Sequence, residues 1–418
     1  MPQHNRKSQF SWALYDWANS AFATTVIAGF FPLFFKQYWS AGVEPTTSTF
    51  WLGLGNSAAS LLILILAPIL GAVADSSGTH KRLLAVFASV GILATAGFFL
   101  IAQGEWTWAI SLYVIAIIGF SGANVFYDAL LPSLTNHQDL HRLSALGYAM
   151  GYLGGGTLFL INVAMTLKPQ WFGLADATAA VRFSFLSVAI WWFVFTIPLM
   201  LGVRNQAPQN PGRVRLRSEF SKLWSTLNNI KKNENLWLFL IAYWFYIDGV
   251  ATIIRMAVDY GIAIGLPSNS LIVALLLVQF IGFPATLVFG RIGLRFGAKR
   301  GLWIGLWAYT VATLCATFMS DVTQFYALAV VLGLVQGGVQ SLSRSLFCQL
   351  IPADKSGEYL GFLNMLGKAA AVLGPLLVGI VAATTGSSRL GLLSIILLFV
   401  IGMWFLYKVR EPASPPPP

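Results

Sequence analysis

The sequence predicts an all-α membrane protein with twelve transmembrane helices in two pseudo-symmetric six-helix bundles. Hydrophobic residues make up 57% of the 418 residues and charged residues only 10%, whereas a soluble domain carries roughly a quarter charged residues. Twelve apolar stretches are each about as long as the 20 residues that a membrane-spanning helix needs. Short motifs also recur in the same order in both halves of the chain. This composition excludes soluble, fibrous and disordered proteins.

The apolar stretches define the predicted domains. The first six spans lie near residues 12–36, 50–72, 83–102, 107–128, 143–166 and 182–202. The second six lie near residues 236–264, 270–290, 301–320, 324–347, 359–383 and 389–408. We therefore expect an N-terminal bundle (1–202), a basic cytoplasmic linker (203–235), a C-terminal bundle (236–410) and a disordered, Pro-rich tail (411–418). Apolar residues recur at helical spacing in the linker, which predicts an amphipathic helix on the inner membrane surface or, alternatively, a solvated connection.

The positive charge reports topology. Most of the 26 Lys and Arg residues lie at the two termini and in the connections after even-numbered spans. The positive-inside rule then places both termini in the cytoplasm, and an even number of spans agrees. We expect a multi-pass protein of the cell inner membrane, monomeric, whose partners are the lipid bilayer and a small-molecule substrate. We expect no nucleic-acid partner. Cys315 and Cys348 give neither a disulfide framework nor a metal-binding spacing.

The two halves of the chain repeat several motifs. Residues 71–82 and 290–300 each contain Gly, six residues, Gly and then a basic pair. Spans 1 and 7 each carry a Tyr close to an Asp. Aligning spans 4 and 10 on their glycines places Asp128 opposite Arg344. Three matches in one order indicate a duplicated six-helix unit, which is common among secondary transporters.

The repeated motifs resemble a known family. Residues 71–82 are similar to the major facilitator superfamily signature between spans 2 and 3, with matches at Gly71, Asp75, Gly78, Lys81 and Arg82. Segments 15–22 and 337–345, with Gly367-Lys368 and Gly374-Pro375, resemble the vacuole-effluxer branch, which includes bacterial members and fungal autophagy-related exporters of amino acids. The resemblance implies the major facilitator fold. It also implies that Asp75, Lys81 and Arg82 form a cytoplasmic latch, whose charge contacts hold the inner face closed.

Ionisable side chains within the spans are the main site candidates, because they are costly in lipid unless they are paired or face water. Asp248 and Arg255 share one face of span 7, Asp16 and Asn19 share one face of span 1, and Lys368 belongs to span 11. A cavity of mixed sign suits a zwitterion, with Arg255 or Lys368 for the carboxylate and Asp248 or Asp16 for the ammonium group. Asp248 is the candidate for a coupling proton, because burial disfavours a charged carboxylate. Alternatively, these charges pair with one another as fixed struts or gate contacts.

Other residues extend this set. Tyr15 and Tyr246 are cavity candidates, because a buried hydroxyl needs a partner. Asp128 and Arg344 lie at the cytoplasmic ends of spans 4 and 10, where they form either a latch across the bundles or ordinary interfacial anchors. Trp12 is expected in an interfacial aromatic belt.

Span 5 is rich in glycine. Gly147 and Gly151 form a Gly-x-x-x-Gly motif, which permits close helix contact. The motif serves either as a sliding surface for bundle motion or as static close packing.

The sequence therefore predicts a secondary transporter that moves a small polar solute, an amino acid by resemblance, by proton-coupled export and alternating access. No ATP site, cofactor or metal site is expected, so an ion gradient of protons supplies the driving force. A transporter of a different small solute is one alternative. An intramembrane protease is another, because Gly119–Gly122 has a Gly-x-Ser-Gly pattern around Ser121. Such a protease needs a histidine base in a neighbouring span, and we assign all four histidines to loops or the terminus. We expect no enzyme and no catalytic residue.

Overall fold

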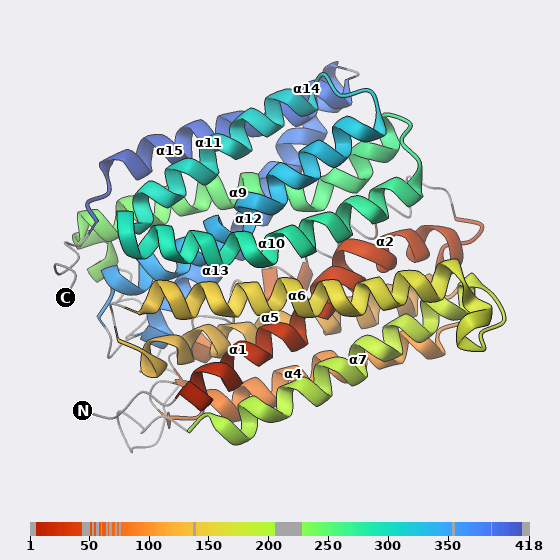
Figure 1. Cartoon of the computed structure of the whole chain (residues 1–418), viewed down its shortest axis with the longest axis horizontal. Helices are drawn as coiled ribbons and strands as arrows, with labels where there is room; N and C mark the ends of the chain where they lie inside the picture. The colour runs from red at the N-terminus through yellow and green to blue at the C-terminus, as the bar shows by residue number, and fades with distance from the viewer. Residues whose placement is uncertain are drawn as a thin grey trace.

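The computed structural model describes residues 6–43, 77–136, 139–204, 228–352, 356–385 and 387–411, with scattered positions between 51 and 74. Within these residues the secondary structure is helical and contains no strand. The long helices lie side by side along the long axis of the molecule (Figure 1). The predicted all-α class is confirmed.

Residues 6–204, here called the N-terminal half, begin with one continuous span whose winding changes along its length. The α1 helix passes into a π-helical segment, and Pro32 lies near the start of the next α-helical turn, where it has no N–H to donate. The elements of this half are α1 (Arg6–Ala21), η1 (Phe22–Phe30), α2 (Phe31–Phe34), η2 (Phe35–Trp39), α4 (His80–Gly97), η3 (Phe98–Leu100), α5 (Trp106–Leu134), α6 (Leu140–Leu167), η4 (Pro169–Phe172) and α7 (Ala177–Gly202).

Residues 228–411, here called the C-terminal half, form a second set of helices. These are α9 (Glu234–Ala263), α10 (Ser268–Phe296), α11 (Ala298–Ala316), α12 (Val322–Leu350), α13 (Ser356–Thr385), α14 (Ser388–Leu393) and α15 (Ile395–Lys408). Most of the expected amphipathic linker helix, residues 205–227, lies outside the described residues.

Within the described residues, nine helices are long and apolar enough to cross a membrane. Predicted spans 9 and 11 correspond to α11 and α13, and predicted span 2 lies largely outside the described residues. The multi-pass architecture is confirmed, and the count of twelve stays a prediction.

Helix packing joins the two halves along a limited surface. The α6 helix packs against α10 and α12 of the other half, and α5 packs against α13. The remaining long helices pack mainly within their own half, such as α4 with α5 and α9 with α15. The contact surface between the halves therefore consists mainly of α5 and α6 on one side and α10, α12 and α13 on the other.

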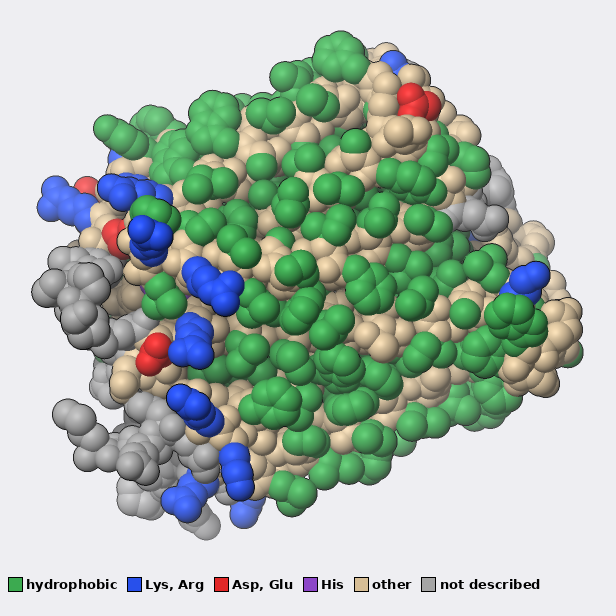
Figure 2. Space-filling model, viewed as in Figure 1, with side chains coloured by type: hydrophobic (Ala, Val, Ile, Leu, Met, Phe, Trp, Pro, Cys, Tyr) green, Lys and Arg blue, Asp and Glu red, His purple; other side chains and the backbone are tan. Residues whose placement is uncertain are grey.

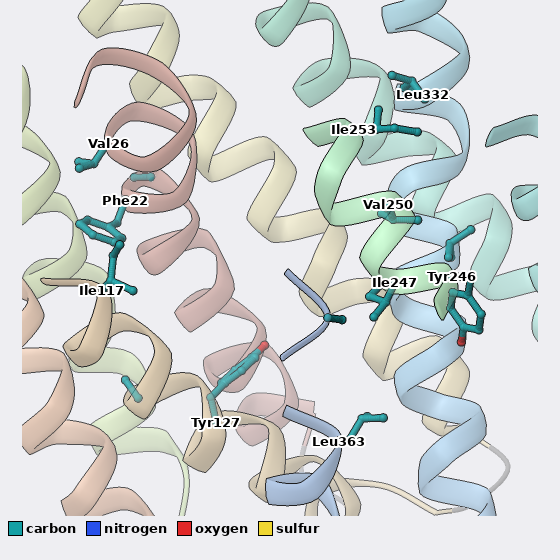
Figure 3. Close-up of a cluster of buried hydrophobic side chains, with 14 of the residues drawn as sticks. Phe22, Val26, Ile117, Tyr127, Tyr246, Ile247, Val250, Ile253, Leu332 and Leu363 are labelled. Carbon is teal, nitrogen blue, oxygen red and sulfur yellow. The ribbon is translucent and has the colours of Figure 1, made fainter. Parts of the chain in front are cut away.

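Buried apolar side chains form one large cluster that extends through both halves. Figure 3 shows Phe22, Val26 and Ile117 between η1 and α5, apart from a second group around Val250 and Ile253 of α9. All five side chains are less than 9% exposed. Because lipid is itself apolar, van der Waals packing of these side chains, and not their removal from water, stabilises the helix contacts.

Basic side chains tie the same pair of helices in both halves. Lys81 Nζ donates to two carbonyls at the end of α7, both at 2.9 Å, and Lys299 Nζ donates to two carbonyls at the end of α15, at 2.6 and 2.8 Å. At the opposite end, Arg182 donates to the Phe99 carbonyl of η3, and Arg389 donates to a carbonyl just after α11. A cation is favourable at a helix C-terminus. We call these four contacts the end ties.

The C-terminal segment is longer than predicted. The Glu411 carboxylate accepts from the backbone N–H groups of Ala298 and Lys299 at the start of α11, and Asn235 pairs with the backbone of Arg410. Our assignment of residue 411 to a disordered tail is therefore wrong, because its carboxylate caps a helix N-terminus. Residues 412–418 lie outside the described residues.

Charge gathers at one end of the molecule. Figure 2 shows Lys and Arg side chains concentrated at the end where α1 begins and α15 finishes, while the middle of the surface is covered by hydrophobic side chains. We call this end the basic end. An apolar band bounded by charge is the surface expected of a protein embedded in a bilayer.

Candidate functional site

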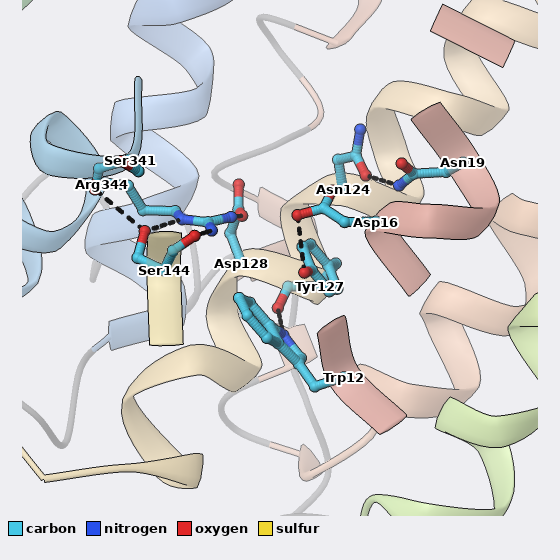
Figure 4. Close-up of polar contacts among 9 residues, drawn as sticks. All are labelled: Trp12, Asp16, Asn19, Asn124, Tyr127, Asp128, Ser144, Ser341 and Arg344. Carbon is cyan, nitrogen blue, oxygen red and sulfur yellow. Dashed lines mark hydrogen bonds and ion pairs between the residues drawn. The ribbon is translucent and has the colours of Figure 1, made fainter. Parts of the chain in front are cut away.

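A buried arginine joins the two halves close to the basic end. Arg344 of α12 is 5% exposed, and its Nη1 lies 2.7 Å from Asp128 Oδ1 of α5. Its Nε and Nη2 donate to the Ser144 hydroxyl and carbonyl of α6, each at 2.9 Å (Figure 4). The planar guanidinium group thus uses its fork of donors on two neighbouring helices at once. Asp128 and Arg344, which the repeat placed opposite each other, form an ion pair.

Three aromatic rings surround the same guanidinium group. Arg344 Cζ lies 4.4 Å from the centroid of the Tyr148 ring, 5.2 Å from that of Trp12 and 5.9 Å from that of Tyr127. These distances are within the reach of cation–π attraction. We call Trp12, Tyr127 and Tyr148 the aromatic cage.

The cage is held together by its own contacts. Trp12 and Tyr127 stack with ring centroids 4.4 Å apart, and Trp12 Nε1 donates to the Tyr127 carbonyl at 2.9 Å. The Tyr127 hydroxyl donates to Asp16 Oδ2 at 2.9 Å. Tyr15 packs against Tyr127 as well, with centroids 5.1 Å apart. The structure thus gathers Asp16 and Tyr15 around the Asp128–Arg344 pair.

Asn19 lies one helical turn beyond Asp16 and also faces α5. Its side-chain amide donates to Asn124 Oδ1 at 2.6 Å. Asn19 is 2% exposed. The shared face predicted for Asp16 and Asn19 therefore contacts α5 (Figure 4).

Gly147 leaves the space that the cage occupies. A Cβ atom added at this position would lie 2.9 Å from Asp16 Oδ2, from a Trp12 ring carbon and from the Tyr127 hydroxyl. Such contacts are closer than real Cβ atoms show. For Gly147 the structure therefore favours close packing, which is one of the two interpretations of the Gly-x-x-x-Gly motif in span 5.

A row of hydrogen bonds continues along α6 and α12. His141 Nδ1 lies 2.6 Å from Ser345 Oγ, and its Nε2 lies 3.0 Å from Gln349 Nε2. Ser144 Oγ donates to the Ser341 carbonyl at 3.1 Å. His141 is buried within α6, so our assignment of all four histidines to loops is wrong. It contacts α12, whereas Ser121 Oγ has no hydrogen-bond partner in the described part of the chain.

The second group of candidates lies inside the C-terminal half. Asp248 is 1% exposed in the middle of α9, and its Oδ1 accepts from the Gly374 backbone N–H at 3.0 Å and from the Thr252 hydroxyl at 3.5 Å. Its Oδ2 is buried without a hydrogen-bond partner among the described residues. Gly374 precedes Pro375, whose missing N–H disturbs the hydrogen bonding of a helix interior.

Tyr246 and Arg255 flank Asp248 along α9. The Tyr246 hydroxyl lies 2.7 Å from Ser343 Oγ of α12, and both residues are buried. Arg255 is exposed and lies two helical turns beyond Asp248, about 10 Å along the axis. Asp248 thus contacts α13, and the side chain of Arg255 is not covered by close packing.

The remaining candidates are placed only in part. Lys81 belongs to the end ties, and its contacts with the end of α7 lie within the N-terminal half. The latch of Asp75, Lys81 and Arg82 stays a prediction. Arg82 is exposed. Asp75 lies outside the described residues, as does the side chain of Lys368, whose backbone belongs to α13.

Sequence reasoning missed three members of the site. Trp12 is fully buried, so its assignment to an interfacial belt is wrong, and Ser144 and Tyr148 were not singled out. A signal for them existed, because His141, Ser144 and Tyr148 fall on one face of α6 at spacings of three and four residues. A polar stripe at the start of an apolar helix indicates contact with another helix.

The family described as vacuole effluxer Atg22 like matches residues 4–414 of the chain. The chain belongs to this family. This Atg22-like protein is 38% identical to the uncharacterized MFS-type transporter YxiO of Bacillus subtilis (strain 168), over 98% of its own length and 96% of that protein. It is 27% identical to autophagy-related protein 22 of Cryptococcus neoformans over 72% of its own length, a match that spans 55% of the fungal protein.

Solved structures show the fold of the Atg22-like protein. The human organic anion transporter MFSD10 has a TM-score of 0.71 at 15% identity, with 97% of this chain and 100% of that one covered. The proton:xylose symporter XylE has a TM-score of 0.70 at 13% identity, with 97% and 95% covered. The predicted major facilitator fold is confirmed. The Atg22-like protein is a secondary transporter with a small-molecule substrate, and the protease alternative is dropped.

Proposed function

We propose that this Atg22-like protein exports a small amino acid across the cell inner membrane, coupled to protons, and works as a monomer with both termini in the cytoplasm. Lys and Arg gather at the basic end, which supports a cytoplasmic position for that end. The division into two bundles is supported by the end ties, which repeat between the halves.

The observation that carries this proposal is the contact of Arg344 with Asp128 and Ser144. It joins opposite halves near the basic end. An exported solute that enters the midplane from the cytoplasm must pass between the halves at the basic end, so these bonds must break once per cycle. Alternating access by rocking of two bundles provides this step.

The two charge signs along α9 support a zwitterionic substrate. Arg255 is exposed and suits a carboxylate, and Asp248 two turns away suits an ammonium group or a proton. Asp248 Oδ2 has no described partner, and a buried carboxylate without a partner is costly unless it is neutralised. Asp248 is accordingly the proposed proton-binding group. Lys368 and Asp16 are the further candidates of each sign.

Transport into proteoliposomes with a panel of labelled amino acids, with and without an imposed pH gradient, tests the proposal. At least one amino acid is expected to accumulate when the gradient is present, and a protonophore is expected to abolish that accumulation. Flux of another small solute and of no amino acid would remove the substrate assignment. Flux that ignores the gradient would remove the proton coupling. The Ser121→Ala variant is the matched control, because a transporter does not need that hydroxyl group.

A further inference from the structure

The guanidinium group of Arg344 occupies a pocket that belongs entirely to the opposite half. Among the described residues, its hydrogen-bond, ion-pair and aromatic partners all come from the N-terminal half: Trp12, Tyr127, Asp128, Ser144 and Tyr148. The side chain itself comes from α12 of the C-terminal half. The pocket is therefore a receptor for a cation, and the other half of the protein supplies the cation.

The chemistry of this pocket suits an organic cation. Aromatic faces attract a positive group through their quadrupoles. A carboxylate, a carbonyl and a hydroxyl oxygen accept its N–H bonds, here from Asp128 and Ser144. A metal ion would prefer a shell of oxygen ligands to aromatic faces.

Two rings of the pocket, those of Trp12 and Tyr127, are held by contacts that do not involve Arg344. Trp12 stacks on Tyr127 and donates to its carbonyl, and the Tyr127 hydroxyl is fixed by Asp16. All three contacts lie between α1 and α5 of the N-terminal half. Separation of the two halves therefore leaves them in place. A binding site that is already organised loses less conformational freedom when it binds.

We propose that, when the halves separate at the basic end, Arg344 leaves this pocket and the ammonium or guanidinium group of the transported solute takes its place. This inference rests on the proposed function and deepens it, because it makes the substrate an organic cation or an amino acid bound by its amino group. Withdrawal of Arg344 alone would remove the cationic partner of the Asp128 carboxylate, which is unfavourable in a partly buried site. A solute cation restores the partner, so solute binding and opening of the basic end favour each other.

Chemical rescue of the purified, full-length Arg344→Ala variant tests the pocket without requiring transport. Its Tm is measured with ethylguanidinium, ethylammonium and the neutral isostere N-ethylurea. One or both cations are expected to raise the Tm, and N-ethylurea is not.

Two further variants make this result specific. Adding Tyr148→Leu to Arg344→Ala is expected to raise the half-saturating concentration of the active cation on the order of tenfold, because a desolvated cation–π contact is lost. Arg389→Ala also removes an arginine that donates to a carbonyl, but one outside the aromatic cage, and its Tm is expected to show no preference for cations. Wild-type protein, whose pocket is filled, is the second control.

An equal response of Arg344→Ala to all three compounds, or no response, would overturn the proposal. If Arg344→Ala does not fold, Arg344→Met repeats the experiment with most of the side-chain volume retained. In proteoliposomes, Tyr148→Leu is expected to raise KM for the transported solute about tenfold with little change in kcat, and an unchanged KM would also contradict the proposal. Cation binding by Arg344→Ala without amino-acid flux by wild type would instead refute only the proposed function.

Discussion

Replacing Asp128 with Asn tests whether its ion pair with Arg344 holds the halves together at the basic end. Asparagine keeps the size of the side chain and one acceptor oxygen, but it removes the negative charge that lies 2.7 Å from the guanidinium group. In the closed state the variant takes away the carboxylate that pairs with a buried arginine, which costs free energy. Opening of the basic end would relieve that cost by hydrating Arg344.

The exposure of the two side chains sets the magnitude. Arg344 and Asp128 are 5% and 15% exposed, so the pair lies toward the buried extreme, where removing one partner costs about 3–5 kcal/mol. A neutral hydrogen bond to asparagine returns about 1 kcal/mol. The net loss of about 2–4 kcal/mol corresponds to a roughly thirty- to several-hundredfold rise in the open fraction.

A native thiol reports this opening. Cys348 is 2% exposed and lies four residues after Arg344, on the same face of α12. The chain has two cysteines, so a Cys315→Ser background leaves Cys348 as its single thiol. The rate at which a water-soluble maleimide modifies Cys348 then follows the population of the open state, provided that closing is faster than the chemical reaction.

The matched control uses the same substitution on the same helix. Asp321 caps the other end of α12 by accepting from the Gln324 N–H, and asparagine is an equally good N-cap. Asp321→Asn should therefore leave the labelling rate unchanged. A rise of less than about threefold in Asp128→Asn would show that this ion pair does not keep the basic end closed.

Three further outcomes follow from the same contacts. Gly147→Ala should lower transport several-fold, measured as initial uptake, because the added Cβ would lie 2.9 Å from both oxygens of the hydrogen bond that joins α1 to α5; wild-type uptake would contradict the packing argument. Asp248→Asn should retain solute exchange but lose its response to a pH gradient, since the amide carries no exchangeable carboxyl proton; an unchanged response would make Asp248 structural. Lys81→Ala and Lys299→Ala should each lower the apparent Tm by about 2–4 °C. Arg82→Ala changes an exposed side chain and should leave the Tm unchanged. A drop in Tm confined to Arg82→Ala would contradict the assignment of the end ties.

The helices of this protein follow closely from local sequence. A run of apolar residues must satisfy its backbone hydrogen bonds internally in lipid, so helices appear wherever such runs occur. The sequence also allowed Asp128 and Arg344 to be predicted at one level of the molecule, because equivalent ends of two repeated spans lie at the same depth. Their positions along the chain therefore determined their level in the membrane.

The direction in which each helix face points was harder to predict from the sequence. Lipid and protein interior are both apolar, so a tryptophan such as Trp12 looks the same in sequence whether it faces headgroups or another helix. Tyr148 was hidden in the same way. The contacts of Lys81 were not predictable for a different reason, since its partners at the end of α7 are more than 100 residues away in the chain.

The end ties have a mechanical consequence. Because α4 is fastened to α7, and α11 to α14 and α15, near both ends, neither half shears easily along its own long axis. Strain from solute binding is then not absorbed inside a bundle and is passed to the surface where α6 meets α10 and α12. Each half therefore moves as a rigid body, and the transporter opens and closes at the interface between the two halves.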